Sequence, residues 1–170
     1  MGPFQSWVRT ATLAGALAVA LAATSASANE TAKLLELDIA GDDNTLQITQ
    51  HFTQSGSAAV NDSTRNILSI TITGNRNGGV AETWRTSLPF ASRLAPGEIV
   101  QSGFGNALSV SVTGHDNLFA MAQSGQNNRI SGEIFGNSNQ SVVTQAGTGN
   151  TTVFRQTGQR NNIVVSQRSY

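Results

Sequence analysis

The sequence predicts an all-β protein, a β-solenoid in which strand–turn–strand coils of about 22 residues, with two strands each, stack in a cross-β-like arrangement. Three observations support this prediction. Glycine and asparagine recur every eleven residues, the segments between them alternate apolar and polar side chains, and glutamines recur in every second repeat unit. One such unit is too short to bury its own apolar face, so the units must stack.

The eleven-residue repeat is marked by a glycine followed three residues later by an asparagine. Both residues accept the positive φ angles of tight turns, so each pair predicts one turn. Earlier pairs, Gly41/Asn44 and Gly74/Asn77, are separated by three times the repeat length, which predicts three repeat units between them. The six consecutive pairs are Gly103/Asn106, Gly114/Asn117, Gly125/Asn128, Gly136/Asn139, Gly147/Asn150 and Gly158/Asn161.

Between the turns, side chains alternate with a period of two, as in Leu108, Val110 and Val112, which are separated by serines. This period predicts a strand with one buried face. Two strands for each coil would give two facing sheets with a narrow core, in which neighbouring strands lie about 4.8 Å apart.

Several glutamines share the parity of the apolar positions and are therefore expected to point inward. Stacked amides satisfy one another's donors and acceptors, so we expect ladders of amides along the stack. Gln126 and Asn127, by contrast, suit solvated turns. The residues expected in ladders, besides the six turn pairs, are Gln101, Gln123, Gln145, Gln156 and Gln167.

Two segments depart from the repeat. Residues 52–66 keep the spacing loosely, with Gln50 and Asn66 in register but Ser63 in place of a glycine. Residues 85–99 contain Pro89 and Pro96, which cannot donate to a ladder. We expect this second segment to be a loop or bulged coil that interrupts the solenoid, with Trp84 and Phe90 covering its edge.

Residues 1–28 are predicted to be a secretory signal peptide. Arg9 precedes a largely apolar run of thirteen residues, and Ala26-Ser27-Ala28 fits the rule for a cleavage site. The run is shorter than the roughly 20 residues of a membrane anchor. Cleavage would leave residues 29–170 as the secreted domain, with no transmembrane segment expected in it.

The composition argues against several function classes. The formal net charge is zero, so a nucleic-acid binder is not expected. Cysteine is absent and there are only two histidines, so we expect no metal, no cofactor and no enzyme activity. Asp42-Asp43-Asn44 and His115-Asp116-Asn117 occupy turn positions, where Asp and Asn are favoured for backbone reasons.

Charge is distributed unevenly along the expected secreted domain. Residues 29–62 carry six acidic side chains against one lysine, whereas residues 129–170 carry four arginines against Glu133 alone. An acidic first coil that meets a basic last coil would favour head-to-tail assembly, with Arg155, Arg160 and Arg168 at the contact. The alternative is that these charges only keep the chain soluble during export.

The segment Gln101-Ser102-Gly103-Phe104-Gly105-Asn106-Ala107 resembles the curlin repeat, written Ser-x5-Gln-x-Gly-x-x-Asn-x-Ala-x3-Gln. Its Gln-x-Gly-x-x-Asn centre recurs at 123–128, 145–150 and 156–161, and the ending Val164-Val165-Ser166-Gln167-Arg168 is similar to the close of the minor, nucleating curlin subunit. Val112 and Ile134 stand where the family has glutamine.

The resemblance implies a subunit of curli, the secreted bacterial amyloid fibres of surface attachment and biofilm matrix. The implied partners are further copies of the chain, other curlin subunits and the curli secretion and assembly machinery, which would export the chain through the periplasm to the cell surface. Whether it is the major or the minor subunit stays open. The alternative is a secreted monomeric β-solenoid that binds polysaccharide or ice, although the pair Thr71 and Thr73 does not recur one coil later.

Overall fold

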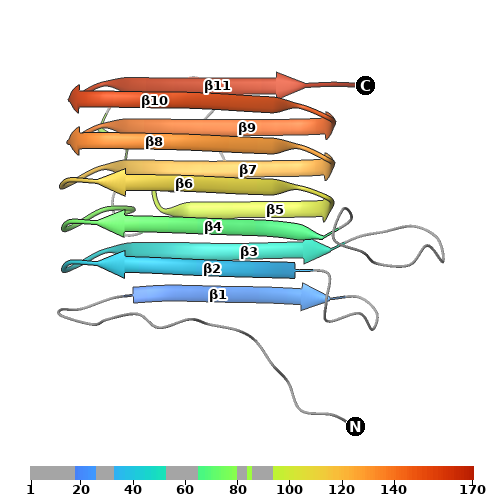
Figure 1. Ribbon diagram of the computed structural model, residues 1–170, viewed down its shortest axis with the longest axis horizontal. Helices are drawn as coiled ribbons and strands as arrows, with labels where there is room; N and C mark the ends of the chain where they lie inside the picture. Colours follow the sequence, from blue (N-terminus) through green and yellow to red (C-terminus); the bar gives the residue numbers. More distant parts are fainter. Residues whose placement is uncertain (1–17, 26–32, 53–64, 80–83, 86–93) are drawn as a thin grey trace, which may run out of the picture.

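The computed structural model describes residues 18–25, 33–52, 65–79, 84–85 and 94–170. Within these ranges the chain forms strands and turns and no helix. The strands lie in two sheets, six-stranded in the order β1-β3-β5-β7-β9-β11 and five-stranded in the order β10-β8-β6-β4-β2, with parallel pairing throughout. The predictions of an all-β chain and of strands stacked in register are confirmed (Figure 1).

The strands have similar lengths and follow one another at short turns. The six-stranded sheet holds β1 (Ala18–Ser25), β3 (Thr45–Phe52), β5 (Glu98–Phe104), β7 (Leu118–Gln126), β9 (Gln140–Thr148) and β11 (Asn162–Arg168). The five-stranded sheet holds β2 (Lys33–Ala40), β4 (Asn66–Thr73), β6 (Ala107–Thr113), β8 (Arg129–Asn137) and β10 (Thr151–Gln159).

Consecutive strands belong to different sheets, so each strand pairs with the strand two places away in the sequence. We call two consecutive strands, one from each sheet, a rung: β2–β3, β4–β5, β6–β7, β8–β9 and β10–β11. The later rungs repeat with the expected coil length, since Val110 pairs with Gly132 and Gly132 with Phe154. Equivalent residues therefore form columns that run through the stack.

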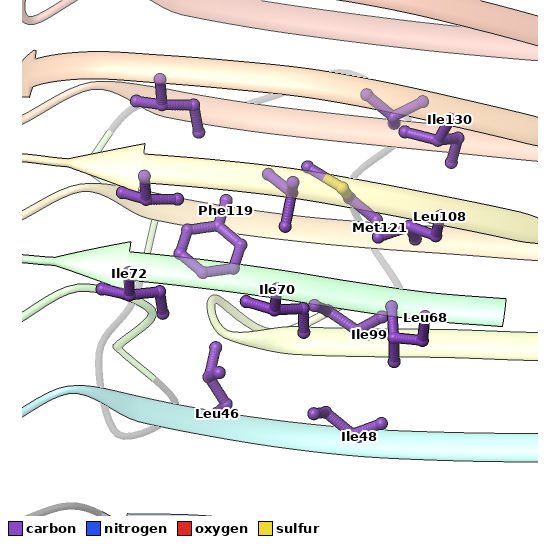
Figure 2. Close-up of a cluster of buried hydrophobic side chains, with 14 of the residues drawn as sticks. Leu46, Ile48, Leu68, Ile70, Ile72, Ile99, Leu108, Phe119, Met121 and Ile130 are labelled. Atoms are coloured by element: carbon purple, nitrogen blue, oxygen red, sulfur yellow. The ribbon is translucent and has the colours of Figure 1, made fainter. Parts of the chain in front are cut away.

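The hydrophobic core lies between the two sheets and follows the alternation of the strands. On β4, Leu68, Ile70 and Ile72 are fully buried, while the residues between them are partly exposed. Figure 2 shows Leu46 and Ile48 of β3 facing the same narrow space as the β4 side chains. Burial of aliphatic side chains at this density stabilises the stack by roughly 1.5–3 kcal/mol for each side chain.

The first irregular spacing has a different cause from the one that the sequence suggested. Gly41 and Gly74 lie in successive rungs, because Ala40 pairs with Thr73 immediately before them. The interval between the two glycines therefore comprises one ordinary rung and eleven additional residues between β3 and β4. The prediction of three repeat units was wrong, because eleven additional residues between two strands have the same length as one unit.

The second irregular segment is inserted between two neighbouring ladder positions of the six-stranded sheet. Gly78 bridges to Leu118, and Gly97 donates its N–H to the carbonyl of Phe119, the next residue. Residues 79–96 are thus inserted into one strand position, whereas Glu98 already belongs to β5. The irregular segment consequently begins and ends earlier in the sequence than the expected 85–99.

Part of this excursion lies against the outer side of the six-stranded sheet. The Arg85 N–H donates to Gln140 Oε1 at 2.8 Å, and Trp84 Nε1 donates to the carbonyl of Leu94 at 2.9 Å. Ala120 and Val142 are fully buried although their parity points outward. Phe90, expected beside Trp84, lies outside the described residues.

β1 lies within residues 1–28, the segment expected to be a signal peptide. It pairs with β3 along its whole length, from Ala18 opposite Thr45 to Ser25 opposite Phe52. Nowhere in the described ranges does a helix have the length and apolar character needed to cross a bilayer.

Candidate functional site

A column of glutamines lies on the inner face of the six-stranded sheet and is a highly regular polar feature of the described chain. Each Nε2 except that of Gln167, the last member, donates to the Oε1 of the glutamine one rung further on, at 2.8–3.0 Å. The same amide also donates to the facing strand of its own rung, as Gln123 does to the carbonyl of Ala107 at 3.1 Å. The glutamines therefore tie rung to rung and sheet to sheet. The column comprises Gln50, Gln101, Gln123, Gln145 and Gln167.

Asparagines form two further columns, one at each end of the rungs. Asn117 Oδ1, for example, accepts from both the backbone N–H and the Nδ2 of Asn139 at 3.1 Å, and Asn139 Nδ2 donates onward to the carbonyl of Gly158 at 2.9 Å. One column holds Asn44, Asn77, Asn117, Asn139 and Asn161, and the other holds Asn66, Asn106, Asn128 and Asn150.

These columns have a direction. Each glutamine of the column below the last rung donates toward the C-terminal rung, while each column asparagine that has another asparagine one rung further on accepts from it through its side-chain oxygen. The two ends of the stack therefore present different groups, and a continuation at either end must have the same direction to satisfy them.

The glycines at the turns also form columns, and glycine is required there because the backbones of successive rungs approach closely. A Cβ on Gly114 would lie 1.9 Å from the carbonyl oxygen of Gly136, and a Cβ on Gly136 would lie 1.9 Å from that of Gly158. On the opposite side of the stack, Gly103 and Gly125 meet the next column glycine in the same way. Gly158 is the last of its column and meets only Asn161 Nδ2, at 3.3 Å.

Four of the five residues at one turn position, two residues after the column glycine, are charged, and all five have a φ between 55° and 59°. Arg76 Nε lies 2.7 Å from Asp116 Oδ1 across one rung. The hydrogen bond from Arg76 holds the pKa of the Asp116 carboxyl below its usual value, against the opposing effect of partial burial. The residues at this position are Asp43, Arg76, Asp116, Ser138 and Arg160.

The three arginines expected at an assembly contact all belong to the last rung. Arg155 on β10 pairs with Glu133 one rung below at 3.1 Å, with both side chains largely exposed. Arg160 occupies the turn between β10 and β11, and Arg168 ends β11 opposite Ala146.

Gln156 does not belong to the glutamine column. It lies on β10, where it accepts from Ser141 Oγ at 2.6 Å and donates to the carbonyl of Gln140 at 3.3 Å. The rungs below it carry Ile134 and Val112 at the same position. A polar pair across the two sheets thus replaces the apolar contact found deeper in the stack.

Sequence reasoning missed two contacts. Ser169 Oγ accepts from the Thr148 N–H at 2.7 Å and from Asn150 Nδ2 at 3.1 Å, and so terminates one asparagine column. Its position, one coil length after Gly147, was the available signal. The Arg76–Asp116 pair gave no such signal, because its partners are 40 residues apart.

Both ends of the core are only partly covered. Leu35 and Leu37 of β2 pack against the core from the first rung, and Phe154 and Val165 pack against it from the last rung, and all four are partly buried. Among the described residues, no strand lies beyond β2, β10 or β11. Apolar side chains and strand edges are therefore left together at the same two surfaces.

The fold and its polar columns define the class: a stacked-repeat β protein whose distinctive chemistry lies in ladders and open ends. In the part of the chain that is described, no group of three histidine or acidic side chains is placed to hold a metal ion. No family model, curated protein or solved structure matches this chain.

Proposed function

We propose that the protein is a structural subunit of secreted, curli-type amyloid fibres, a β-solenoid that assembles by adding the rungs of one molecule to those of the next. Such fibres would serve cell adhesion and biofilm matrix at the cell surface, and the subunit would be either the bulk component or the nucleator. The observation that carries the proposal is that the outer edges of β2, β10 and β11 are open in the described chain and coincide with partly buried core side chains at both ends of the stack. Exposed edges of this kind recruit further strands.

The two ends match when a second copy continues the register of the stack. Its first rung, placed on β10–β11, would set its Leu37 over Phe154 and its Ile48 over Val165, since these residues belong to the same columns. Its Gln50 would accept from Gln167 in the manner of every lower glutamine. Apolar and amide columns would thus run uninterrupted from one molecule into the next.

The charges at the ends match in the same register. Arg160 would lie one rung below Asp43 of the second copy, which is the relation of Arg76 to Asp116 within the chain. Arg155 would lie below Asp38 of the second copy. Exposed ion pairs contribute only about 0–1 kcal/mol each, so these contacts would set polarity and rate more than affinity. Contact between unlike ends is heterologous and generates an open filament.

Incubation of purified residues 29–170 tests the proposal. We expect fibres that bind thioflavin and diffract with the cross-β spacings of about 4.8 Å and about 10 Å. A chain that remains monomeric at high concentration would overturn it. A stable monomer that binds ice or polysaccharide would support the alternative of a secreted binding module.

A further inference from the structure

The N-terminal end of the stack is stepped. β1 extends the six-stranded sheet one strand beyond β3, whereas the five-stranded sheet ends at β2 in the described chain (Figure 1). A half rung therefore projects from a stack that otherwise consists of two-strand rungs.

β1 occupies the edge that an added molecule needs. Ala23 of β1 lies opposite Gln50 in a parallel ladder. When the last rung of a second copy meets the first rung of this one, its Gln167 belongs at that same position, because Gln50, Gln101, Gln123, Gln145 and Gln167 form one column. One strand edge has one set of N–H and C=O groups, so β1 and the β11 of a second copy exclude each other.

We propose that the outer edge of β3 is a strand-receiving site, filled by β1 in the full chain and by β11 of a second copy in the fibre. β1 is then a removable cap on the N-terminal end of the stack. This inference rests on the proposed function, since it concerns the surface through which the subunits would join.

The cap acts at one end only. A second copy that placed its β11 on β1 instead would leave its β10 without a strand to pair with, because nothing in the described chain continues the five-stranded sheet beyond β2. The C-terminal end, formed by β10 and β11, is unaffected and joins a fibre normally. A full chain therefore adds to the N-terminal end of a growing fibre and blocks further addition there. Loss of residues 1–28 leaves β2 and β3 as the last strands of their two sheets, both with an open outer edge.

Hydrogen exchange on the soluble monomers tests the receiving site without reference to fibres. Thr45 and Gln47 donate away from β1, to the carbonyls of Asn77 and Gly97, so the amides of Leu46, Ile48 and Gln50 face β1 by alternation. We expect these three amides to exchange slowly in the full chain and much faster in residues 29–170, while the Gln47 amide changes little. Equal exchange in the two proteins would overturn the proposal.

Seeded growth tests the cap. We expect the unprocessed full chain, added at a small mole fraction to residues 29–170 and preformed seeds, to stop growth at one fibre end and leave the other end growing, which roughly halves the rate. The double variant Ala20→Pro/Ala23→Pro places proline at both parities of β1, so at least one ladder donor is lost and growth is restored. Ala28→Pro, outside β1, is the matched control and should inhibit like the full chain.

The outcomes separate the two proposals. Fibres from residues 29–170 whose growth the full chain leaves unchanged would refute the cap and leave the proposed function standing. Absence of fibres from residues 29–170 would refute the proposed function, and the exchange of Leu46, Ile48 and Gln50 would still decide whether β1 occupies the edge of β3.

Discussion

The central rungs, β6–β7 and β8–β9, and the last rung, β10–β11, are built from the same repeat but differ in what their residues contact. Gly136 meets the backbone of the next rung, whereas Gly158 meets only a side chain of its own turn. Asn139 is fully buried, whereas its counterpart Asn161 is exposed. The difference shows that the stack, and not the repeat alone, gives each residue its role. A change that destroys the fold in the centre should, in the last rung, act mainly on assembly.

The glycine column gives the largest expected contrast. Gly136→Ala places a Cβ 1.9 Å from the carbonyl oxygen of Gly158 at a φ of +123°, so we expect a loss of about 3–5 kcal/mol in the free energy of unfolding. Gly158→Ala has only the cost of its φ of +109°, about 1–3 kcal/mol, in the monomer. In the fibre its Cβ would meet Gly41 of the next copy, and elongation should stop at that end. Urea unfolding and seeded growth measure the two effects.

Gly149→Ala is the control for this pair of variants. Gly149 has a φ of +72°, and nothing lies within 4 Å of the position that a Cβ would take, so the substitution adds backbone strain without a contact. It should lower stability slightly and leave elongation unchanged. Fibres of Gly158→Ala that grow at both ends like those of Gly149→Ala would contradict the stacking of Gly158 on a second copy.

The glutamine column gives the second contrast. Gln123→Leu removes the donor to Gln145 Oε1 and the acceptor of Gln101 Nε2 inside a buried column, which we expect to cost about 2–3 kcal/mol. Gln167→Leu, in the last rung, takes the donor from no column oxygen and leaves Gln145 Nε2 its bonds to the carbonyl of Arg129 and to Thr152 Oγ1, so we expect about 1 kcal/mol or less. The midpoint of urea unfolding measures both. Equal losses would show that the amide ladder does not depend on position in the stack.

These columns are also the part of the molecule that the sequence predicts best. Strand parity places Gln101, Gln123, Gln145 and Gln167 inward, and a constant step of two repeat units stacks them. Where the interval between turn glycines changes, counting repeat units along the sequence fails. The interval alone cannot distinguish another repeat unit from additional residues between two strands. Arg76 and Asp116 are brought together only because Gly78 and Gly97 occupy neighbouring ladder positions, opposite Leu118 and Phe119.

Parity alone does not decide which column a glutamine joins. Gln156 is buried, as its parity predicts, yet it lies on β10 above Ile134, in the other sheet, and so binds Ser141 across the core. Sequence spacing by elevens assigns both sheets the same pattern. Only the alternation of strands between sheets decides which glutamines share a column.

Charge reversal in the last rung should have a smaller effect, on the rate of fibre elongation. Arg160→Glu would oppose Asp43 of the next copy, and we expect elongation to slow several-fold at low salt and to recover near 1 M salt, where the Debye length is about 3 Å. Asp43→Arg in the same chain should restore the rate, because Arg76 shows that arginine is accommodated at this turn position. Seeded growth followed by thioflavin fluorescence measures these rates.

Arg168→Glu is the matched control for the charge reversal. In the proposed register Arg168 meets His51 of the next copy and no carboxylate, because Ala146, Ser124 and Ser102 lie between them in one column. We expect little change in elongation. A loss equal to that of Arg160→Glu would mean that total charge, and not register, governs the encounter.

The Arg76–Asp116 ion pair within the stack should give the smallest effect, a change in how the free energy of unfolding depends on pH. The pKa of Asp116 is lowered by Arg76, so the pair stabilises the fold above the unfolded-state pKa of about 3.9 and loses this contribution as the pH falls through the lower folded-state pKa. Both side chains are partly exposed, which limits the contribution to about 1 kcal/mol or less. Asp116→Asn should therefore lower stability slightly at pH 7 and flatten its decline in acid. Arg160→Gln, above the uncharged Ser138, should leave that decline unchanged, and urea unfolding from pH 7 to pH 2 compares the two variants.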